Sequence, residues 1–389
     1  MTQSPYRPSS LAACHNIADL RQLAQRRLPK VMFDYIDGAA EDEVTRNRNM
    51  ADFGNLQFVP RTLTDVSQVS LATRIQGIDT PLPLFFSPTG GCRLFHTDGD
   101  LAVSKVAEQR GMIYSLSSMA TYDIETVARH SKATKWFQIY VWKDRGVVKE
   151  FIARCKAAGY HALILTVDVQ TSGQRERDLR NGFTLPPKFT VSSLFDMALH
   201  PRWWWSVLTT PTITLANVVG KGALGVNNAT AMGQYAASQL DPSVTYDDLA
   251  WMIEQWGGPF LVKGLVSAED ARRVVDIGAT GVMLSNHGGR QLDHSISPIT
   301  ALPAVVDAIG GKADIIVDGG VRRGTDIIKA LCLGATACSI GRAYLYGLGA
   351  GGQPGVDRAI TLLQAELKRA MMLLGCNDVK KLGRQYLRS

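Results

Sequence analysis

The stretch PFLVKGLVSAEDARRVVDIGATGVML, residues 259–284, contains one complete strand–helix–strand unit and indicates the fold class. Pro259–Val262 and Gly281–Leu284 are short apolar runs rich in strand formers, and Ala268–Ile277 between them has the spacing of an amphipathic helix. Strands that are apolar throughout and joined through a helix are typical of a parallel sheet with both faces covered. The unit therefore predicts α/β architecture.

This pattern recurs along the chain and predicts eight strands. They are Leu82–Ser87, Met112–Leu116, Trp136–Val141, Ala162–Val167, Pro259–Val262, Gly281–Leu284, Asp314–Val317 and Ala337–Ile340. Amphipathic stretches lie between most of them: Gly99–Arg110, Ile124–His130, Arg145–Ala158, Ala268–Ile277, Ile299–Ile309 and Arg323–Leu333. Eight such units predict a closed (β/α)8 TIM barrel. The alternative, an open doubly wound sheet, would be expected to carry a GxGxxG loop after an early strand, and no early strand is followed by such a loop.

Three further segments complete the predicted organisation. Ile17–Asp37 is expected to form a helical leader, and Val356–Leu374 a helical tail. Residues 1–80 are assigned to the leader and barrel lead-in, and 81–389 to the barrel. The fourth predicted strand ends at Val167 and the fifth begins at Pro259, a separation far beyond an ordinary connection, so an insertion is placed at about 183–245 between strands 4 and 5.

The insertion has an unusual composition. It contains Pro186-Pro187, the cluster Trp203-Trp204-Trp205 and the glycine- and asparagine-rich stretch Gly220–Asn228. Adjacent tryptophans suit core packing, a contact between subunits or an anchor at a membrane surface, because the indole ring favours boundaries between apolar and wet surroundings. All three interpretations remain open at this stage.

Composition excludes several classes of protein. A chain of 389 residues that is 46% hydrophobic can bury a large core, and it has neither an 18-residue apolar run nor an apolar signal-peptide core in Met1–Ser10. A cytoplasmic location is expected.

Six scattered cysteines without a CxxC motif suit free thiols, and no metal site is expected. The net charge of +7 suggests anionic partners, but the basic residues are dispersed, which favours a phosphate cofactor, an acidic substrate or an anionic membrane over nucleic acid.

Polar residues stand at nearly every predicted strand end, where barrel enzymes carry their chemistry. Buried polar groups cost free energy unless they have partners, so this density is hard to explain as packing. The residues are Pro88, Thr89, Gly90 and Gly91; Ser117 and Ser118; Gln138 and Tyr140; Thr166 and Asp168; Lys263; Ser285 to Arg290; Asp318, Gly319, Gly320 and Arg322; and Gly341 and Arg342.

The loops after strands seven and eight predict a phosphate site, because they combine glycine backbone amides with Arg322 and Arg342. Lys263 lies at the end of the fifth strand, where burial without an anionic partner would be expensive. It suggests a cofactor with electron-rich oxygens or nitrogens, as a flavin has, although a lysine reaching solvent is the simpler alternative.

The segment Ser285-Asn286-His287-Gly288-Gly289-Arg290-Gln291-Leu292-Asp293 places an imidazole and a guanidinium on one loop. Its two glycines free the backbone for tight turns, so both side chains can point back toward one small acidic substrate. A base beside an anion clamp can take a proton from an alcohol next to a carboxylate. An isolated His-x-x-Arg sequence would be interpreted as an ordinary loop. The polar residues at the other predicted strand ends favour a functional site instead.

In this order, these motifs resemble those of the FMN-dependent L-2-hydroxy-acid oxidoreductases, which include glycolate oxidase, mandelate dehydrogenase and the flavin L-lactate dehydrogenases and oxidases. The resemblance covers nearly the whole chain. It rests on Leu28-Pro29-Lys30, Phe33-Asp34-Tyr35, Phe137 to Tyr140, Thr166 to Asp168, Gly173 to Asp178, Val262-Lys263-Gly264, Ser285 to Asp293 and Asp318 to Gly324.

The resemblance implies roles for individual residues. His287 would be the catalytic base and Asp168 its partner, while Arg175 and Arg290 bind the substrate carboxylate and Tyr35 and Tyr140 hydrogen-bond the substrate. It implies FMN as cofactor, held or approached by Pro88, Thr89, Gly90, Ser117, Gln138, Thr166, Lys263, Ser285, Asp318, Gly319, Gly320, Arg322, Gly341 and Arg342. It also implies a homo-oligomer, most simply a tetramer.

Three features separate subfamilies. Gly90 stands where glycolate oxidases and many lactate enzymes have alanine, and it resembles mandelate dehydrogenases and lactate monooxygenases in this. Met119 stands where glycolate oxidase has tryptophan. The segment His200 to Trp205 resembles that of cytochrome- or quinone-linked bacterial L-lactate dehydrogenases, where it is associated with the inner face of the membrane. L-Lactate is the substrate expected first and a mandelate-type acid second, with a quinone, a cytochrome or oxygen as electron acceptor. An FMN-dependent isomerase of the isopentenyl diphosphate type and a non-catalytic flavin scaffold are remote alternatives, because neither needs His287 together with the arginines.

Overall fold

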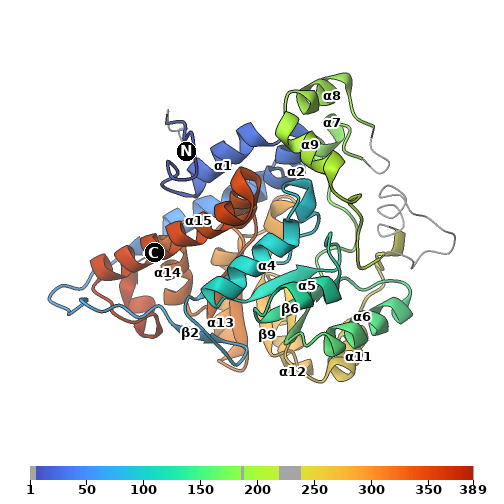
Figure 1. Ribbon diagram of the computed structural model, residues 1–389. Coiled ribbons are helices and arrows are strands. Elements are labelled where there is room, and N and C mark those ends of the chain that lie inside the picture. Colours follow the sequence, from blue (N-terminus) through green and yellow to red (C-terminus); the bar gives the residue numbers. More distant parts are fainter. Residues whose placement is uncertain (1–5, 185–187, 219–237, 389) are drawn as a thin grey trace.

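The computed structural model describes residues 6–184, 188–218 and 238–388, and its centre is a closed barrel of eight parallel strands (Figure 1). The predicted TIM barrel is therefore confirmed. The strands are β4 (Leu84–Phe86), β5 (Tyr114–Ser117), β6 (Lys135–Ile139), β7 (Ala162–Thr166), β8 (Phe260–Leu265), β9 (Gly281–Leu284), β10 (Asp314–Asp318) and β11 (Ala337–Ile340). They follow one another in chain order around the barrel, and β11 closes it by pairing with β4.

A helix follows each strand and covers the outside of the barrel. These helices are α4 (Gly99–Arg110), α5 (Ile124–His130), α6 (Arg145–Ala157), α11 (Tyr246–Trp256), α12 (Ala268–Ile277), α13 (Pro298–Ile309), α14 (Gly324–Cys332) and α15 (Arg342–Leu374). Helix α15 continues through a kink at Gly351 and Gly352, where the backbone of Gly352 is left-handed. The predicted tail Val356–Leu374 is thus the second half of a longer helix, because the glycines bend the chain without ending it.

The barrel interior is filled by an apolar layer to which all eight strand segments contribute. It consists of Ile75, Phe85, Ile113, Trp136, Ala162, Ile164, Leu261, Met283, Ile316 and Ala337. Side chains alternate along a strand, so the residues two positions further toward the carboxyl ends face the same interior. Those residues are polar and buried: Ser87, Ser115, Gln138, Thr166, Lys263, Ser285, Asp318 and Ser339. A polar layer therefore rests on an apolar one, at the end where barrel enzymes bind substrates.

The predicted single leader helix is two helices, α1 (Ile17–Arg27) and α2 (Lys30–Asp37). Leu28, between them, is extended with φ −100° and ψ 144°, as expected of a residue that precedes a proline. The chain continues through α3 (Val44–Ala51), then β1 (Gln57–Phe58), which pairs with β12 (Leu387–Arg388). The hairpin of β2 (Thr73–Ile75) and β3 (Ile78–Thr80) contributes Ile75 to the interior layer.

The insertion contains α8 (Val191–Ala198) and α9 (Pro201–Thr209), which project at the upper right of Figure 1 beyond α2, and α7 (Glu176–Arg180) lies just before it. Its Trp203 packs against the core and donates its indole N–H to the Leu94 carbonyl over 2.9 Å, whereas Trp205 is 62% exposed. The tryptophan cluster thus has one anchoring and one exposed member. Pro186-Pro187 and Gly220–Asn228 lie outside the described residues.

Candidate active site

The polar layer contains a buried ion pair. Lys263 Nζ lies 2.9 Å from Asp318 Oδ2 and donates to Ser285 Oγ over 2.9 Å, while Ser339 Oγ donates to Asp318 Oδ1 over 2.6 Å. Burial disfavours both charges, but Asp318 raises the pKa of Lys263 above its usual value. Burial would likewise raise the pKa of Asp318, and the ammonium of Lys263 overcomes this and brings it to about 2. Lys263 is therefore buried and positively charged inside the barrel, and it does not reach solvent.

A second group in this layer fits a flavin. Gln138 Oε1 accepts a hydrogen bond from Ser117 Oγ at 2.9 Å, which directs its amide nitrogen away from the serine. That nitrogen is buried and has no hydrogen-bond partner among the described residues. Since an unsatisfied buried donor costs about 1–3 kcal/mol, it is suited to a cofactor carbonyl such as those of an isoalloxazine ring. Thr166 and Lys263 are neighbours in the register of β7 and β8 and contribute further polar groups.

His287 and Asp168 form the candidate catalytic pair. The imidazole Nδ1 lies 2.9 Å from Asp168 Oδ1, although the two residues come from the loops after β9 and β7. His287 has a left-handed backbone with φ 55°, and its amide donates to Ser285 Oγ over 3.1 Å. Gly264 allows the carboxylate to sit there, because a Cβ at that position would lie 2.7 Å from Asp168 Cγ. The geometry leaves Nε2 as the ring atom that can act as a base.

The electrostatics of this pair suit a base that is neutral before the reaction. Burial lowers the pKa of His287 below its ordinary value, and the charges of Lys263 and Arg175 lower it further, against the opposing effect of Asp168. Burial would raise the pKa of Asp168, but His287 and Lys263 bring it below the ordinary value. Asp168 therefore stays ionised and stabilises the imidazolium once it forms.

The predicted arginines and tyrosines cluster beside His287. The guanidinium carbon of Arg290 lies 4.8 Å from the ring centre of Tyr35, and Arg290 Nη1 donates to the Tyr35 carbonyl over 2.6 Å. Burial and the charge of Arg175 lower the pKa of Arg290 to about 10, and burial raises the pKa of Tyr140. Arg175 Nε is buried without a described partner. Two neighbouring guanidinium groups are a fitting receptor for one carboxylate.

Helix α2 carries Tyr35, and a buried carboxylate fixes this helix. Asp37, which is fully buried, pairs with Arg21 at 2.6 Å, Arg46 at 3.0 Å and Arg177 at 3.1 Å. Burial would raise its pKa, but the hydrogen bond from Arg21 and the charge of Arg46 hold it well below its usual range. Because Arg177 belongs to α7, the network ties the leader to the segment that begins at Arg175.

The predicted phosphate site is a concentration of positive charge. Arg342 donates to the carbonyls of Ile36, Gly288 and Gly38 over 2.7 to 2.9 Å. Burial lowers its pKa to about 9, with further lowering by neighbouring arginines that include Arg290 and Arg322. Gly319 and Gly320 both have positive φ, and a Cβ on Gly320 would clash with the Asn49 carbonyl. An excess of buried positive charge beside such glycines suits an anion.

Thr89, Gly90 and Met119 lie at the ends of β4 and β5. Thr89 Oγ1 hydrogen-bonds the hydroxyl of Tyr344, and Thr89 Cγ2 is the nearest atom to a Cβ built on Gly341. Pro88 lies two residues after the end of β4 and is partly buried. Gly90 faces Met119, so the two residues that distinguish subfamilies are in contact.

Several residues that contribute to the site were not predicted from the sequence. Ser339 bonds Asp318, and Ser87 lies in the same polar layer, yet neither was singled out. The two-residue period along β11 and β4 was the available signal. Phe95 and Phe183 flank the ring of Tyr35 with ring centres 6.1 and 5.0 Å away. Their contact with Tyr35 joins distant segments, so no local pattern could reveal it.

Comparison with known proteins agrees with this flavin-type barrel. The model of the FMN-dependent dehydrogenase family matches residues 24–389. The chain is 42% identical to an L-lactate oxidase of Nostoc sp., covering 96% of this chain and 97% of that protein. It is 39% identical to an L-lactate dehydrogenase of Caulobacter sp., covering 95% and 97%. The crystal structure of the monotopic membrane protein (S)-mandelate dehydrogenase superposes with a TM-score of 0.93 at 40% identity, over 96% and 99% of the two chains.

The fold and site thus define a flavin-dependent oxidoreductase built on a TIM barrel. The chain belongs to the FMN-dependent dehydrogenase family, and FMN is its cofactor. The resemblance to the FMN-dependent 2-hydroxy-acid oxidoreductases is thereby confirmed.

Proposed function

We propose that this enzyme oxidises an L-2-hydroxy acid, with L-lactate first, to the 2-oxo acid, and that His287 is the base. The observation that carries the proposal is the His287–Asp168 pair, 2.9 Å apart, placed beside Arg175 and Arg290. A secondary alcohol becomes a hydride donor as its proton leaves, so a base and a carboxylate clamp must act on one molecule.

Each residue then has a defined task. Arg175 and Arg290 bind the carboxylate and orient the α-carbon, while the hydroxyls of Tyr35 and Tyr140 bind the substrate oxygens. His287 accepts the hydroxyl proton at Nε2, and Asp168 stabilises the resulting positive charge through Nδ1. Phe95 and Phe183 pack against the ring of Tyr35 and would limit the access of water to this reaction.

Bound FMN would supply the hydride acceptor for the α-carbon. The ring would be held by Thr89, Gly90, Ser117, Gln138, Thr166 and Lys263, and the ribityl phosphate chain by Ser285, Asp318, Gly319, Gly320, Arg322, Gly341 and Arg342. The support is the buried amide of Gln138, the charge of Lys263 and the buried guanidinium of Arg342. Lys263 would favour the negative charge that the reduced ring acquires.

We propose L-lactate ahead of a mandelate-type acid as the substrate, because relatives of this chain are named for lactate. The contact between Gly90 and Met119 permits larger side chains, because methionine is flexible and repacks readily. An L-mandelate-type dehydrogenase is accordingly the second candidate function, supported by the solved mandelate dehydrogenase.

The insertion supports peripheral attachment to a membrane. Helices α8 and α9, with the residue that ends α8, expose six large apolar side chains, which together we call the α8–α9 face: Val191, Leu194, Phe195, Leu199, Trp205 and Leu208. No helix in the described part of the chain is long and apolar enough to cross a bilayer. An apolar face of this kind, with Arg202 exposed beside it, suits attachment to the inner surface of the cell membrane, with a quinone or cytochrome as acceptor. A homotetramer remains part of the proposal on family resemblance alone.

One experiment tests the central proposal. The purified protein is denatured and its flavin identified, and the intact enzyme is mixed anaerobically with a panel of L- and D-2-hydroxy acids while flavin absorbance is followed. Release of FMN and bleaching by L-lactate are expected, with D-acids poor. Release of another flavin, or failure of every L-2-hydroxy acid to bleach the enzyme, contradicts the proposal.

A further inference from the structure

The segment that joins β7 to α7 carries two of the proposed catalytic residues and has no regular secondary structure. It spans residues 167–175, with Asp168 near its start and Arg175 at its end. Asp168 is the partner of His287, and Arg175 belongs to the proposed carboxylate clamp. Because an irregular segment forms no regular ladder of backbone hydrogen bonds, its position depends on the groups elsewhere in the fold that bond its backbone.

This segment lies between a cavity and the loop after β9. In the part of the chain that the structure describes, the cavity has a volume of about 720 Å³, and its wall includes the loops after β7, β8 and β9 and the N-terminal ends of α11 and α12. The contact with the loop after β9 is close, since a Cβ on Gly173 would clash with the Arg290 carbonyl oxygen. The segment therefore depends on that loop, and not on packing from the cavity side, for its position.

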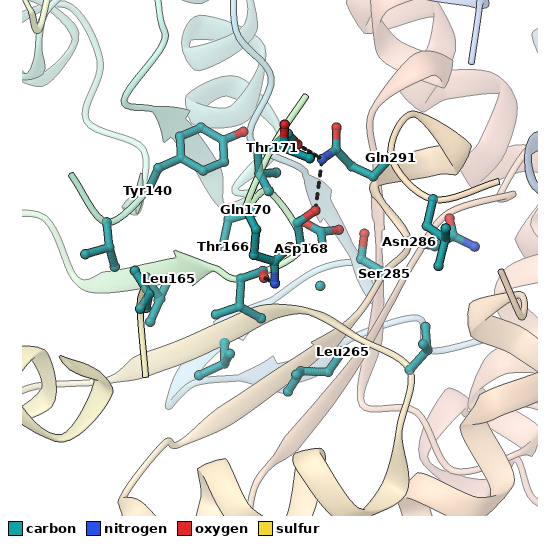
Figure 2. Close-up of a pocket in the computed structure, with 18 of the residues that line it drawn as sticks. Tyr140, Leu165, Thr166, Asp168, Gln170, Thr171, Leu265, Ser285, Asn286 and Gln291 are labelled. Atoms are coloured by element: carbon teal, nitrogen blue, oxygen red, sulfur yellow. Dashed lines mark hydrogen bonds between the residues drawn. The ribbon is translucent and has the colours of Figure 1, made fainter. Parts of the chain in front are cut away.

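The side chain of Gln291 bridges the two loops. Figure 2 shows its nitrogen donating to the backbone carbonyls of Asp168, over 3.0 Å, and Thr171, over 2.7 Å. Its oxygen accepts a hydrogen bond from the backbone amide of Gly173 over 3.3 Å. Both N–H donors of the side-chain amide and its acceptor oxygen are thus engaged. One side chain holds the segment at three points between Asp168 and Gly173.

This bridge joins the two halves of the proposed catalytic site. Gln291 directly follows Arg290 and lies four residues after His287. Its hydrogen bonds therefore connect the loop that carries the base and one clamp arginine to the segment that carries Asp168 and the other arginine. A displacement of about 1 Å between reacting groups can cost about 100-fold in rate, so the spacing of these loops matters.

We propose that Gln291 is a positioning residue, which holds Asp168 in place against His287; this inference rests on the proposed function. The charged groups that act on His287 are Asp168, which raises its pKa, and Lys263 and Arg175, which lower it. The effect of Asp168 is larger than that of either cation. Loosening Asp168 should therefore lower the pKa of His287, whereas loss of a residue that only stabilises the fold would leave that pKa unchanged.

Gln291→Met tests the bridge, because methionine keeps the length of the side chain and removes all three hydrogen bonds. The matched control is Gln170→Met, on the same segment, where an exposed side-chain amide donates to the nearby Val167 carbonyl over 2.8 Å. Both variants are also made in the Asp168→Asn enzyme. The FMN content of each holoenzyme is measured, and the second-order rate constant of flavin reduction by L-lactate is followed anaerobically across pH.

Gln291→Met should retain FMN, slow flavin reduction by about tenfold or more and move the pH inflection of the rate constant to lower pH. In the Asp168→Asn enzyme the same change should slow reduction by less than about threefold, because the effects of residues that act through one another do not add. Gln170→Met should stay within about twofold of its parent in both backgrounds. Equal slowing by Gln291→Met in both backgrounds, or an inflection that it leaves in place, would overturn the positioning role.

Gly173→Ala gives a second test that leaves Gln291 in place, because the added methyl group pushes the two loops apart. It should slow reduction more in the wild-type background than in Asp168→Asn, and equal slowing would contradict the inference. A wild-type rate for Gln291→Met, with His287→Gln slow, would overturn the positioning role alone. Failure of every L-2-hydroxy acid to reduce the wild-type enzyme, or reduction of His287→Gln at the wild-type rate, would instead overturn the proposed function.

Discussion

Gly90 and Met119 are packed so closely that a Cβ on residue 90 would lie 3.0 Å from both the Cβ and the carbonyl oxygen of Met119. A methyl group there is tighter than ordinary van der Waals contact, and the carbonyl belongs to the backbone, so it cannot move as a flexible side chain does. In the proposed site, the room beyond the substrate's α-carbon would be set by this pair, and not by Gly90 alone.

Gly90→Ala should consequently shift the loop that carries Met119. We expect FMN to be retained and the ratio of kcat/KM for L-mandelate to that for L-lactate to change by about threefold or more, because a displacement of a few tenths of an ångström alters a fitted pocket. The measurement is steady-state kinetics with both acids. Gly54→Ala is the control, since nothing lies within 4 Å of a Cβ there. An unchanged ratio for Gly90→Ala would remove the pair from substrate selection.

His287→Gln should keep FMN and slow flavin reduction by about 100-fold or more, the contribution of a general base. Glutamine preserves polarity and hydrogen-bonding capacity but cannot accept the proton. Anaerobic stopped-flow absorbance with L-lactate measures the effect. Reduction at nearly the wild-type rate would mean that another group is the base.

The rate of reduction should depend on pH through His287 itself. Burial lowers the pKa of His287 below its ordinary value of about 6.5, and only the neutral ring can accept a proton, so kcat/KM should rise with pH through an inflection below that value and then level off. Asp168 opposes this lowering, so Asp168→Asn should move the inflection to lower pH while reducing the maximal rate. An inflection above 6.5 in the wild type, or one that Asp168→Asn leaves in place, would contradict the assignment.

Arg290→Lys should mainly weaken substrate capture. Lysine keeps the charge but cannot form two parallel hydrogen bonds to a carboxylate, and it would also lose the contact with the Tyr35 ring at 4.8 Å. We expect KM for L-lactate to rise more than kcat falls. Arg48→Lys, at a guanidinium bonded to the Ser295 carbonyl, provides a charge-matched control outside the clamp.

The barrel was predictable because its strands are apolar on both faces and its helices are amphipathic, and these are local signals. Of the proposed catalytic residues, Tyr140, Asp168, His287 and Arg290 were predictable because they follow strand ends in recognisable motifs. Tyr35 on α2 and Arg175 before α7 were assigned from the family resemblance. Pairings such as Asp37 with Arg21, Arg46 and Arg177 were not, since they join segments distant in the sequence through contacts that leave no periodicity. The cavity behind Asp168 was hidden for the same reason, because its wall is assembled from several loops and two helices.

The tryptophan cluster illustrates the limit within a single motif. Composition suggested three roles for Trp203, Trp204 and Trp205 together, whereas the fold separates them: Trp203 is tied to Leu94, and Trp205 is exposed. Which member of an apolar run faces inward depends on where the helix docks, and that information is absent from the run itself.

The α8–α9 face leads to the last prediction, association with anionic membranes. Phe195, Trp205 and Leu208 are 67%, 62% and 72% exposed, and each large apolar side chain transferred from water contributes about 1.5–3 kcal/mol. Attraction between the basic protein and anionic lipid adds about 1 kcal/mol per basic residue near the surface, which gives reversible binding that salt weakens.

The protein should therefore sediment with anionic liposomes at low salt. Replacing Phe195, Trp205 and Leu208 by serine should abolish sedimentation while activity with a dye acceptor remains. Trp203 is left intact because its hydrogen bond to the Leu94 carbonyl ties α9 to the rest of the protein. The control carries serine at Leu63, Met372 and Leu373, which are exposed apolar residues outside the insertion. If the intact protein stays in the supernatant at low salt, or if the control loses binding equally, the α8–α9 face is not the membrane contact.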